Sequence, residues 1–273
     1  MSVCIIGGGP AGIFTANNLL KYKPIIYDPQ PFGKIKSHFL PSPSNKIYEE
    51  KMKNILSQCV LKKQYIKNLN ELPECSVYVV AIGAEPKKGL GITYDDLIKN
   101  KLNPKNAIVI GMGDVSFDIA RRLTNKVDIL GKHTFTESKF SNSLLRNLGK
   151  ANYVNVMPLV DMENRRNKIA LKNHDTDSRI SLHFDAFPIE INEKDNKYEV
   201  KLKNGSKIEG DILVNATGYQ PRNTTELTKN VNKPIYYIGA CSNPKGNIGT
   251  IITEANDLSE KIKRELDKRN ILL

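Results

Sequence analysis

The stretch Val3-Cys4-Ile5-Ile6-Gly7-Gly8-Gly9-Pro10-Ala11-Gly12 decides the fold of this chain. Its four apolar residues predict a buried strand, and its glycines at 7, 9 and 12 have the spacing of a dinucleotide fingerprint. The first glycine allows a tight turn, the second lets the backbone approach a diphosphate, and the third lets the next helix pack on the strand. We expect the start of that helix to attract phosphate, with the contacts made by Gly7, Gly9, Pro10, Ala11 and Gly12.

The residues that follow complete the opening of a Rossmann unit. Apolar residues at helical spacing over 13–20 precede a second strand, 24–28, which ends at Asp28. A carboxylate about twenty residues after the first glycine hydrogen-bonds ribose hydroxyls and repels a 2′-phosphate. The sequence therefore predicts FAD or NAD at this site, not NADP. A glycine turn without a ligand is the alternative, and the combined strand, spacing, helix and acid disfavour it.

A second fingerprint, Ala107-Ile108-Val109-Ile110-Gly111-Met112-Gly113-Asp114-Val115-Ser116, lies about a hundred residues further on. Ser116 replaces the third glycine, which remains compatible with helix packing. The predicted contacts are Gly111, Met112, Gly113, Asp114 and Val115. Two fingerprints in one chain indicate two cofactors, with electrons passing between them.

Basic residues follow the next predicted strand, where an NAD site would carry an acid. Lys132 and His133 stand in this place, and a lysine there can contact the 2′-phosphate of NADP. Lysine offers a point charge, not the planar fork of arginine. The sequence therefore favours NADP at this site, with NADH as the other nucleotide to test. The alternative is that Lys132 and His133 are ordinary surface residues.

Composition bounds the class of protein. The chain has 273 residues, 40% of them hydrophobic, and a net charge of +12. No apolar run approaches the roughly 18 residues of a membrane helix, and the first strand starts too early for an N-terminal targeting peptide. The charge fits a solvated Lys-rich surface or an acidic partner; nucleic acid is disfavoured, because recognition motifs are missing.

The four cysteines are at positions 4, 59, 75 and 241, and none forms a C-x-x-C pair. This spacing predicts neither a disulfide framework nor a zinc or iron–sulfur site. Cys4 is expected to be a small buried hydrophobe.

Further apolar strands are predicted at 77–83, 211–218 and 234–239, with a last helix over 249–268. Asn204-Gly205 predicts a type I′ hairpin. The resulting fold class is α/β, with two Rossmann-like, three-layer dinucleotide-binding domains. The second domain, 103–216, would be inserted in the first, 1–102 plus 217–273.

Beyond the fingerprints, several segments resemble the adrenodoxin reductase-type ferredoxin–NADP reductases. The similarity covers most of the chain. It includes Tyr27-Asp28-Pro29-Gln30-Pro31-Phe32-Gly33, Val80-Ala81-Ile82-Gly83-Ala84-Glu85, Gly113-Asp114-Val115-Ser116-Phe117-Asp118-Ile119-Ala120-Arg121, Asn215-Ala216-Thr217-Gly218-Tyr219 and Pro244-Lys245-Gly246-Asn247-Ile248-Gly249-Thr250.

The resemblance implies further cofactor contacts. For FAD these are Gly33, Lys34, Gly239, Ala240, Gly246, Asn247 and Ile248, and Gly246 also faces NADP. It implies hydride transfer from NADPH to the flavin and release of single electrons to a ferredoxin. No catalytic side chain is required, although Asp118 is a candidate for support, and no metal site is implied.

The chain departs from the family at four places. The family's paired arginines correspond to Lys132 and His133, and an NADP-binding glutamate corresponds to Leu144. A tryptophan near the flavin falls at about Ala240, and a histidine that pairs with the aspartate matching Asp118 falls at about Asn45. These departures make NADPH turnover the property to test.

The resemblance also implies a partner, an acidic [2Fe–2S] ferredoxin held by a basic face. Arg165, Arg166, Lys168 and Lys172 match the family's basic cluster, with a solvated loop as the alternative. The expected protein is a monomer that supplies electrons for iron–sulfur cluster assembly, in a mitochondrion or an organelle derived from one. Without a presequence, the cytoplasm is the other compartment.

Other functions share this architecture. A thiol-disulfide flavoenzyme needs a cysteine pair near the flavin, and the small subunit of glutamate synthase needs N-terminal iron–sulfur cysteines. A flavin monooxygenase is possible on the fold alone. A chain that binds FAD as an interaction protein, without NADPH turnover, is the alternative from a different class.

Overall fold

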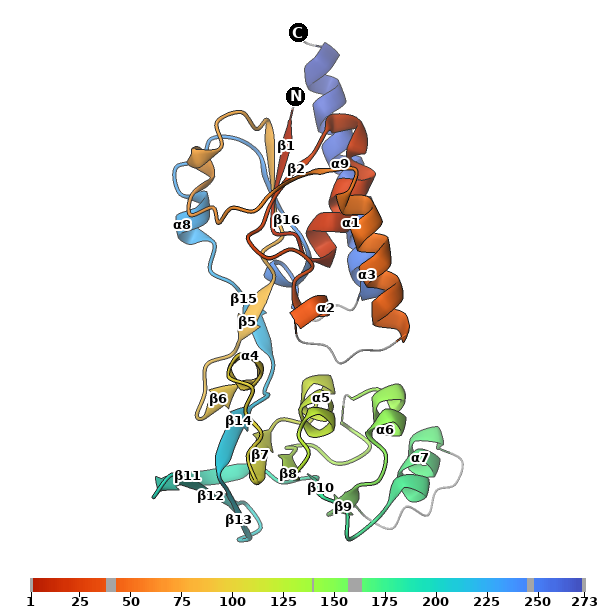
Figure 1. The fold of residues 1–273 in the computed structure, drawn as a ribbon, viewed down its shortest axis with the longest axis vertical. Helices are drawn as coiled ribbons and strands as arrows, with labels where there is room; N and C mark the ends of the chain where they lie inside the picture. Colours follow the sequence, from red (N-terminus) through yellow and green to blue (C-terminus); the bar gives the residue numbers. More distant parts are fainter. Residues whose placement is uncertain (1, 38–42, 139, 157–163, 245–247, 272–273) are drawn as a thin grey trace. The chain divides into compact units, whose positions relative to one another are not determined.

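The computed structural model describes residues 2–37, 43–138, 140–156, 164–244 and 248–271, and the chain divides into two compact units (Figure 1). The first unit consists of Met1–Glu85 and Tyr219–Leu273, and the second of Pro86–Gly218. The chain passes from the first unit to the second between Glu85 and Pro86, earlier than the predicted boundary at 102/103. The reason is that β6 (Ile92–Thr93) pairs with β14 (Ile212–Asn215), which places this segment in the second unit. The assignment of one cofactor to each unit stays a prediction.

The first unit is built on a five-stranded parallel sheet in the order β16-β4-β1-β2-β3. The strands are β1 (Val3–Ile6), β2 (Ile25–Tyr27), β3 (Val60–Lys62), β4 (Val77–Val80) and β16 (Ile235–Tyr237). The long helices α1 (Pro10–Asn18), α3 (Pro43–Leu56) and α9 (Ile248–Ile271) share one core with one face of this sheet. The other face packs on a cluster that includes Leu69, Leu72 and Leu227, the last from α8 (Thr225–Thr228). Short elements complete the unit: η1 (Leu20–Tyr22), α2 (Lys34–Ser37), η2 (Leu69–Glu71) and η3 (Gly239–Cys241).

The second unit has a six-stranded parallel sheet in the order β6-β14-β7-β8-β10-β9. Its remaining strands are β7 (Asn106–Ile110), β8 (Lys126–Leu130), β9 (Asn152–Val154) and β10 (Ile180–His183). One face packs on α4 (Tyr94–Lys99), α5 (Asp114–Arg122), α6 (Asn142–Leu148) and α7 (Arg165–Asn173). The other face is covered by an antiparallel sheet of β11 (Pro188–Lys194), β12 (Lys197–Leu202) and β13 (Lys207–Gly210). These layers confirm the predicted fold class. The chain passes between the units through a two-stranded sheet of β5 (Ala84–Pro86) and β15 (Tyr219–Pro221).

The hairpin prediction is wrong in its turn type. A type I′ turn requires a positive φ at both Asn204 and Gly205. Gly205 has a φ of +84°, but the φ of Asn204 is not positive. The Gly205 N–H donates to the Leu202 carbonyl, and the Leu202 N–H donates to the Ser206 carbonyl. This is a three-residue loop with glycine in the left-handed position. The two-residue hairpin with both φ values positive occurs earlier, at Asp195-Asn196.

The basic segment 165–172 forms a helix, α7, where the sequence left a solvated loop as an alternative. The Asn164 side chain caps it by accepting a hydrogen bond from the Arg166 N–H. Ser141 caps α6 in the same way by accepting from the Leu144 N–H. The capping residues Asn164 and Ser141 are the sequence signals for the starts of these two short helices.

The expectation that the cysteines form no disulfide is also wrong. Cys4 and Cys75, 71 residues apart in sequence, are joined by a disulfide and both are buried. Neither sulfur is therefore available as a thiolate ligand, although Glu74 lies close enough to complete a metal-binding group. Sequence spacing missed this pair because the parallel pairing of β1 with β4 brings it together.

None of the helices in the part of the chain that the structure describes is both long and apolar enough to cross a membrane.

Tyr153 gives a stability prediction. Its hydroxyl is buried without a hydrogen-bond partner in the described structure, among the rings of Phe135, Phe184 and His174. A buried unpaired hydroxyl costs at least about 1 kcal/mol, and each kcal/mol shifts the melting temperature of a chain of this size by roughly 2–4 °C, so Tyr153→Phe is expected to raise it by at least roughly 2 °C. Burial raises the pKa of the Tyr153 phenol. The unfolded chain therefore ionises first as the pH rises through about 10, and only the wild type loses stability from this residue there.

The matched control is Tyr78→Phe. The Tyr78 hydroxyl donates to the Leu72 carbonyl over 2.6 Å, so its removal should lower the melting temperature. Thermal unfolding followed by circular dichroism measures both variants. A lower melting temperature for Tyr153→Phe would contradict the prediction.

Candidate dinucleotide-binding sites

The first fingerprint forms a tight junction at the end of β1. Gly7 has a φ of +110°, and a Cβ on it would lie 2.3 Å from the carbonyl oxygen of Ala81, which follows β4. Gly12 packs more closely still, since a Cβ there would lie 1.9 Å from the Gly7 carbonyl oxygen. The first and third glycines thus let the two strands and α1 meet.

The middle glycine faces open space. Gly9 is the N-cap residue of α1, and a Cβ on it would meet nothing within 4 Å. The first turn of α1 carries no acidic residue. Free N–H groups and the positive end of the helix dipole favour an anion here, and no side chain of the described residues lies within 4 Å of the Cβ position of Gly9. The diphosphate of a dinucleotide fits this cradle.

Asp28 braces the glycine turn. One carboxylate oxygen accepts from the Gly8 N–H at 2.6 Å, and the other accepts from the Gln30 N–H at 2.7 Å. The loop after β2 returns to the same turn, because the Phe32 N–H donates to the Gly8 carbonyl at 2.7 Å. A Cβ on Gly33 would lie 3.3 Å from the Gly9 Cα. Asp28 therefore has a structural role besides the predicted contact with ribose.

The C-terminal segment of the first unit reaches the same place. A Cβ on Gly239 would lie 2.6 Å from the Ala11 Cβ, so Gly239 and Ala240 in η3 begin against α1. The Lys34 ammonium lies 3.6 Å from the centre of the Tyr219 ring. Predicted FAD residues from distant parts of the sequence are thus gathered at one edge of the sheet.

The structure describes only part of the last predicted FAD segment, 246–248. Gly246 and Asn247 lie outside the described residues, and with them the second predicted role of Gly246 in NADP binding. Ile248 begins α9 and packs, partly buried, against the core of the first unit.

The second fingerprint repeats this geometry in the second unit. Gly111 has a φ of +111°, and its Cβ would lie 2.4 Å from the Ala216 carbonyl oxygen after β14. Gly113 is the N-cap residue of α5, and a Cβ on it would meet nothing within 4 Å. At the third position the Ser116 hydroxyl donates to the Gly111 carbonyl at 2.6 Å. A hydrogen bond here replaces the close packing that Gly12 makes in the first unit.

The other predicted NADP residues surround this turn. Met112 packs over Gly131, and Val115 is partly buried on the core. Lys132 and His133 are exposed just after β8. This position suits a contact with a 2′-phosphate and an ordinary surface equally, so that role stays a prediction. Leu144 packs against the core and contributes no charge.

Asp114 distinguishes the two cradles, because it puts an acid in the first turn of α5. Its carboxylate accepts from the Ser141 N–H at 3.2 Å, and although the residue is exposed, partial loss of solvent around the carboxylate raises its pKa. An ionised carboxylate beside the phosphate cradle repels a dinucleotide. Asp114→Asn keeps an acceptor for Ser141 and is expected to tighten NADPH binding about three- to tenfold near pH 8.

The gain should shrink as the pH falls, because the wild-type carboxyl then takes up a proton. Titration calorimetry with NADPH across the pH range measures this dependence. Asp195→Asn makes the same charge change in an exposed hairpin turn and serves as the control. An equal gain in both variants would show that only net charge matters.

Asp118 lies on the buried face of α5. Its carboxylate is 3.4 Å from the Arg121 guanidinium. Burial raises the pKa of Asp118, while Arg121 and Arg122 lower it in part. The side chain of Asn45, which takes the place of the family's pairing histidine, lies outside the described residues. The supporting role of Asp118 stays a prediction.

The predicted docking residues all lie on α7, but they are not equivalent. The Arg166 guanidinium donates to the carbonyls of Ser138 at 2.7 Å and Phe140 at 3.1 Å, and it lies over the Phe140 ring. It therefore braces the segment before α6. Arg165, Lys168 and Lys172 are exposed and are the members of the set available to a partner.

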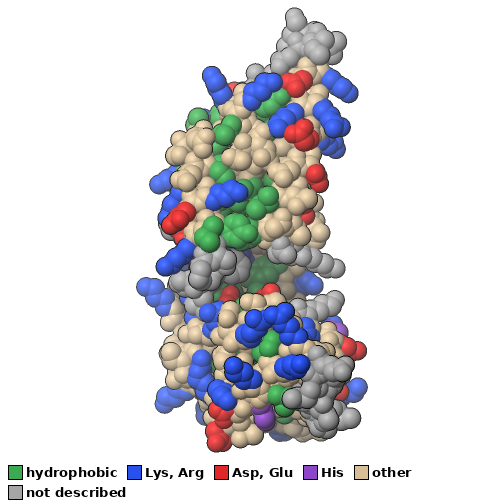
Figure 2. All heavy atoms as spheres, turned by 90° about the vertical axis from the view of Figure 1, so that its right-hand side faces the viewer, with side chains coloured by type: hydrophobic (Ala, Val, Ile, Leu, Met, Phe, Trp, Pro, Cys, Tyr) green, Lys and Arg blue, Asp and Glu red, His purple; other side chains and the backbone are tan. Residues whose placement is uncertain are grey.

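Lys and Arg side chains gather on the face of the second unit that Figure 2 shows, over α6 and α7. Neither helix carries an acidic residue. This face is therefore a local excess of positive charge, which attracts an acidic surface.

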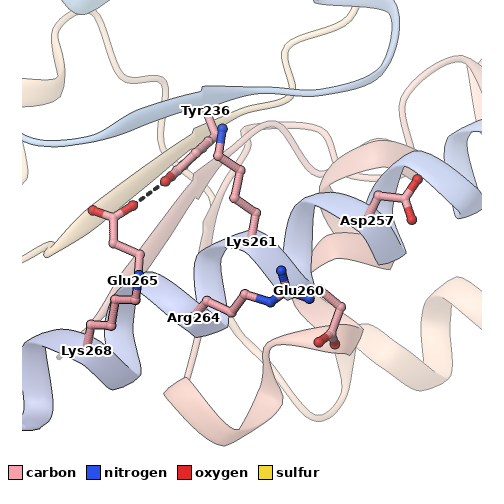
Figure 3. Close-up of a pocket in the computed structure, with 7 residues that line it drawn as sticks. All are labelled: Tyr236, Asp257, Glu260, Lys261, Arg264, Glu265 and Lys268. Carbon is pink, nitrogen blue, oxygen red and sulfur yellow. Dashed lines mark hydrogen bonds between the residues drawn. The ribbon is translucent and has the colours of Figure 1, made fainter.

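A hollow of about 580 Å³ lies beside α9 in the first unit (Figure 3). Its lining consists of Tyr236, Asp257, Glu260, Lys261, Arg264, Glu265 and Lys268. The Tyr236 hydroxyl donates to the Glu265 carboxylate. The charges of its three basic and three acidic side chains balance. None of the lining residues is a predicted contact of FAD or NADP.

Two dinucleotide cradles in one chain are the architecture of oxidoreductases that use a flavin and a pyridine nucleotide. The chain belongs to the pyridine nucleotide-disulphide oxidoreductase family, whose model matches residues 74–240, more than half of the sequence. It is 27% identical over 176 residues to the mitochondrial NADPH:adrenodoxin oxidoreductase of Salvelinus fontinalis, and 28% identical over 197 residues to the probable enzyme of Dictyostelium discoideum. These matches cover 50% and 57% of this chain but only 34% and 37% of the relatives.

Solved structures share the fold. FprA from Mycobacterium tuberculosis in complex with NADPH matches with a TM-score of 0.77 and 19% identity, over 98% of this chain and 85% of that one. Thioredoxin reductase of Lactococcus lactis matches with a TM-score of 0.68 and 16% identity, over 96% and 98%. The two-cofactor fold class predicted from the sequence is confirmed.

Proposed function

We propose that the chain is an FAD-dependent NADPH:ferredoxin oxidoreductase, which takes electrons from NADPH and delivers them to an acidic [2Fe–2S] ferredoxin. Its relatives suggest a place in a mitochondrion or a derived organelle, where such electrons serve iron–sulfur cluster assembly. The observation that carries the proposal is the pair of open cradles at Gly9 and Gly113, one in each unit.

The residues of the first unit would hold FAD by its diphosphate and ribose. The N–H groups at the start of α1 face the diphosphate, and the Asp28 carboxylate, already fixed by Gly8 and Gln30, faces the ribose. In the second unit the start of α5 has the same task for NADPH, with Lys132 as the cation for its 2′-phosphate. A bound flavin supplies the two-electron and one-electron chemistry.

A thiol-disulfide activity is the second function that the family suggests. The structure does contain a cysteine pair, Cys4 and Cys75. Cys75 precedes the start of β4, however, whereas the glycine turn follows the end of β1 in the same parallel sheet. Cofactors bind beyond the carboxyl ends of parallel strands. The cysteine pair lies toward the amino ends of β1 and β4, at the other end of these strands from the predicted cofactor site.

The direct test starts with the purified chain reconstituted with FAD. It should be yellow, bleach under NADPH without oxygen, and then reduce a [2Fe–2S] ferredoxin. Protein that takes up no FAD would overturn the proposal. Yellow protein that stays oxidised with both NADPH and NADH would favour the interaction protein, and bleaching without ferredoxin reduction would favour another acceptor.

Charge reversal on α7 tests the docking face. Replacing Arg165, Lys168 and Lys172 by glutamate should lower kcat/KM for ferredoxin about tenfold or more at low salt, because steered association depends on this field. The rate of flavin reduction by NADPH should be the same in the variant and the wild type. The difference in kcat/KM between them should become smaller as the salt concentration rises, because salt screens these charges. Ferredoxin-coupled reduction of cytochrome c measures the rate.

The control is the same reversal at Lys261, Arg264 and Lys268 on α9. These cations have identical spacing along a helix, but acids accompany them (Figure 3). An equal loss in both triple variants would contradict a docking role for α7.

A further inference from the structure

The Cys4–Cys75 disulfide lies in the first unit, away from the predicted cofactor contacts. Cys4 is in β1, and Cys75 stands two residues before β4. Their Cα atoms are 5.7 Å apart, within the ordinary range for a disulfide, and both side chains are buried. Both belong to the core cluster on the sheet face opposite α1, together with Tyr27 and Tyr78. The bond therefore joins two neighbouring strands of the sheet inside a packed core.

The closed loop contains the first cofactor site. The 71-residue separation spans the glycine turn, Asp28 and the loop to Gly33. A cross-link restricts the unfolded chain, and the effect grows with the length of the loop it closes. Reduction should thus weaken the part of the first unit that forms the cradle.

Besides the buried contacts of Leu72 and Cys75, polar bonds near the surface hold the segment around Cys75. The Lys233 ammonium donates to the carbonyls of Pro73 and Cys75 at 2.5 and 2.7 Å. The Ser76 N–H donates to the Ser2 carbonyl at 2.8 Å, and the Tyr27 hydroxyl donates to Glu74 at 3.0 Å. Pro73 and Glu74 are exposed. Local opening at this corner would expose the Cys75 side of the bond to a small reagent while the sheet stays folded.

We propose that Cys4 and Cys75 form a reversible redox switch, which exchanges with a small disulfide of the glutathione class and controls the stability of the first unit. Oxidation breaks two S–H bonds and forms one S–S bond. The small disulfide takes up the two electrons and two protons and leaves as two thiols. The stability effect stands on the cysteines alone; control of FAD retention rests on the proposed function.

The test uses the full chain without added cofactor, equilibrated with oxidised or reduced glutathione. Iodoacetamide under denaturing conditions and intact mass then count the thiols. Two thiols, Cys59 and Cys241, should react after oxidation and all four after reduction. The oxidised protein should melt about 10 °C higher. Cys59→Ser should keep this difference, while Cys75→Ser should abolish it and melt like the reduced wild type.

Four reactive thiols in the oxidised sample, or equal melting temperatures in both samples, would overturn the switch. A second readout follows FAD release from reconstituted protein by fluorescence, which should be slower in the oxidised form. A chain that shows the thiol count and melting shift but takes up no FAD keeps the switch and loses the proposed function.

Discussion

Replacing Gly9 by alanine should abolish FAD binding and leave the apoprotein folded. The φ of Gly9 is −78°, which alanine adopts without strain, and among the described residues beyond its chain neighbours the new methyl group would meet no atom within 4 Å. The methyl group would instead occupy the space that the backbone offers to the diphosphate. We expect FAD affinity to fall about 100-fold or more, or about 2.7 kcal/mol. Flavin absorbance after gel filtration measures the loss, and thermal unfolding of the apoprotein checks the fold.

The chain supplies its own control in Gly113→Ala. Gly113 has the same open surroundings and a φ of −117° at the start of α5. This variant should keep its yellow colour and lose reduction by NADPH, whereas Gly9→Ala loses the flavin itself. Retention of FAD by Gly9→Ala would place the diphosphate elsewhere. Loss of FAD from both variants would show that the glycines only serve the fold.

The sequence predicted the two cradles because their geometry is local. A glycine spacing of two and then three residues fixes a turn and a helix start within a single loop, whatever lies elsewhere in the fold. The aspartate at the end of β2 was found for the same reason. Its bond to the Gln30 N–H, two residues further on, is equally local. Its bond to the Gly8 N–H, however, depends on how β2 lies beside β1, and no spacing rule contains it.

What the sequence missed depends on contacts between distant segments. The Cys4–Cys75 pair comes from the parallel register of β1 and β4. Arg166 looked equivalent to its basic neighbours, and only the carbonyls of Ser138 and Phe140 show that it braces a loop. The turn at Asn204-Gly205 was misjudged because the register of β12 and β13 sets the loop length.

The two fingerprints differ most at their third position, and this difference predicts unequal effects. Gly12→Ala should strongly destabilise the first unit, because its Cβ would lie 1.9 Å from the Gly7 carbonyl oxygen. The Cβ is fixed to the backbone of α1 and the oxygen belongs to the backbone at the end of β1, so relief requires α1 to move off the sheet. α1 packs against α3 and α9 in the same core, and its displacement would disturb that core. We expect destabilisation of more than about 3 kcal/mol.

Ser116→Ala makes the matched change in the second unit. It removes only the hydroxyl that donates to the Gly111 carbonyl at 2.6 Å, and it should cost about 1 kcal/mol. Urea unfolding of both variants, followed by circular dichroism, gives the two free energies of unfolding. If the two costs are equal, helix α1 has room to shift and the close packing at Gly12 does not hold the junction. If Ser116→Ala costs more, the hydrogen bond that replaces the glycine stabilises the second cradle more than backbone contact stabilises the first.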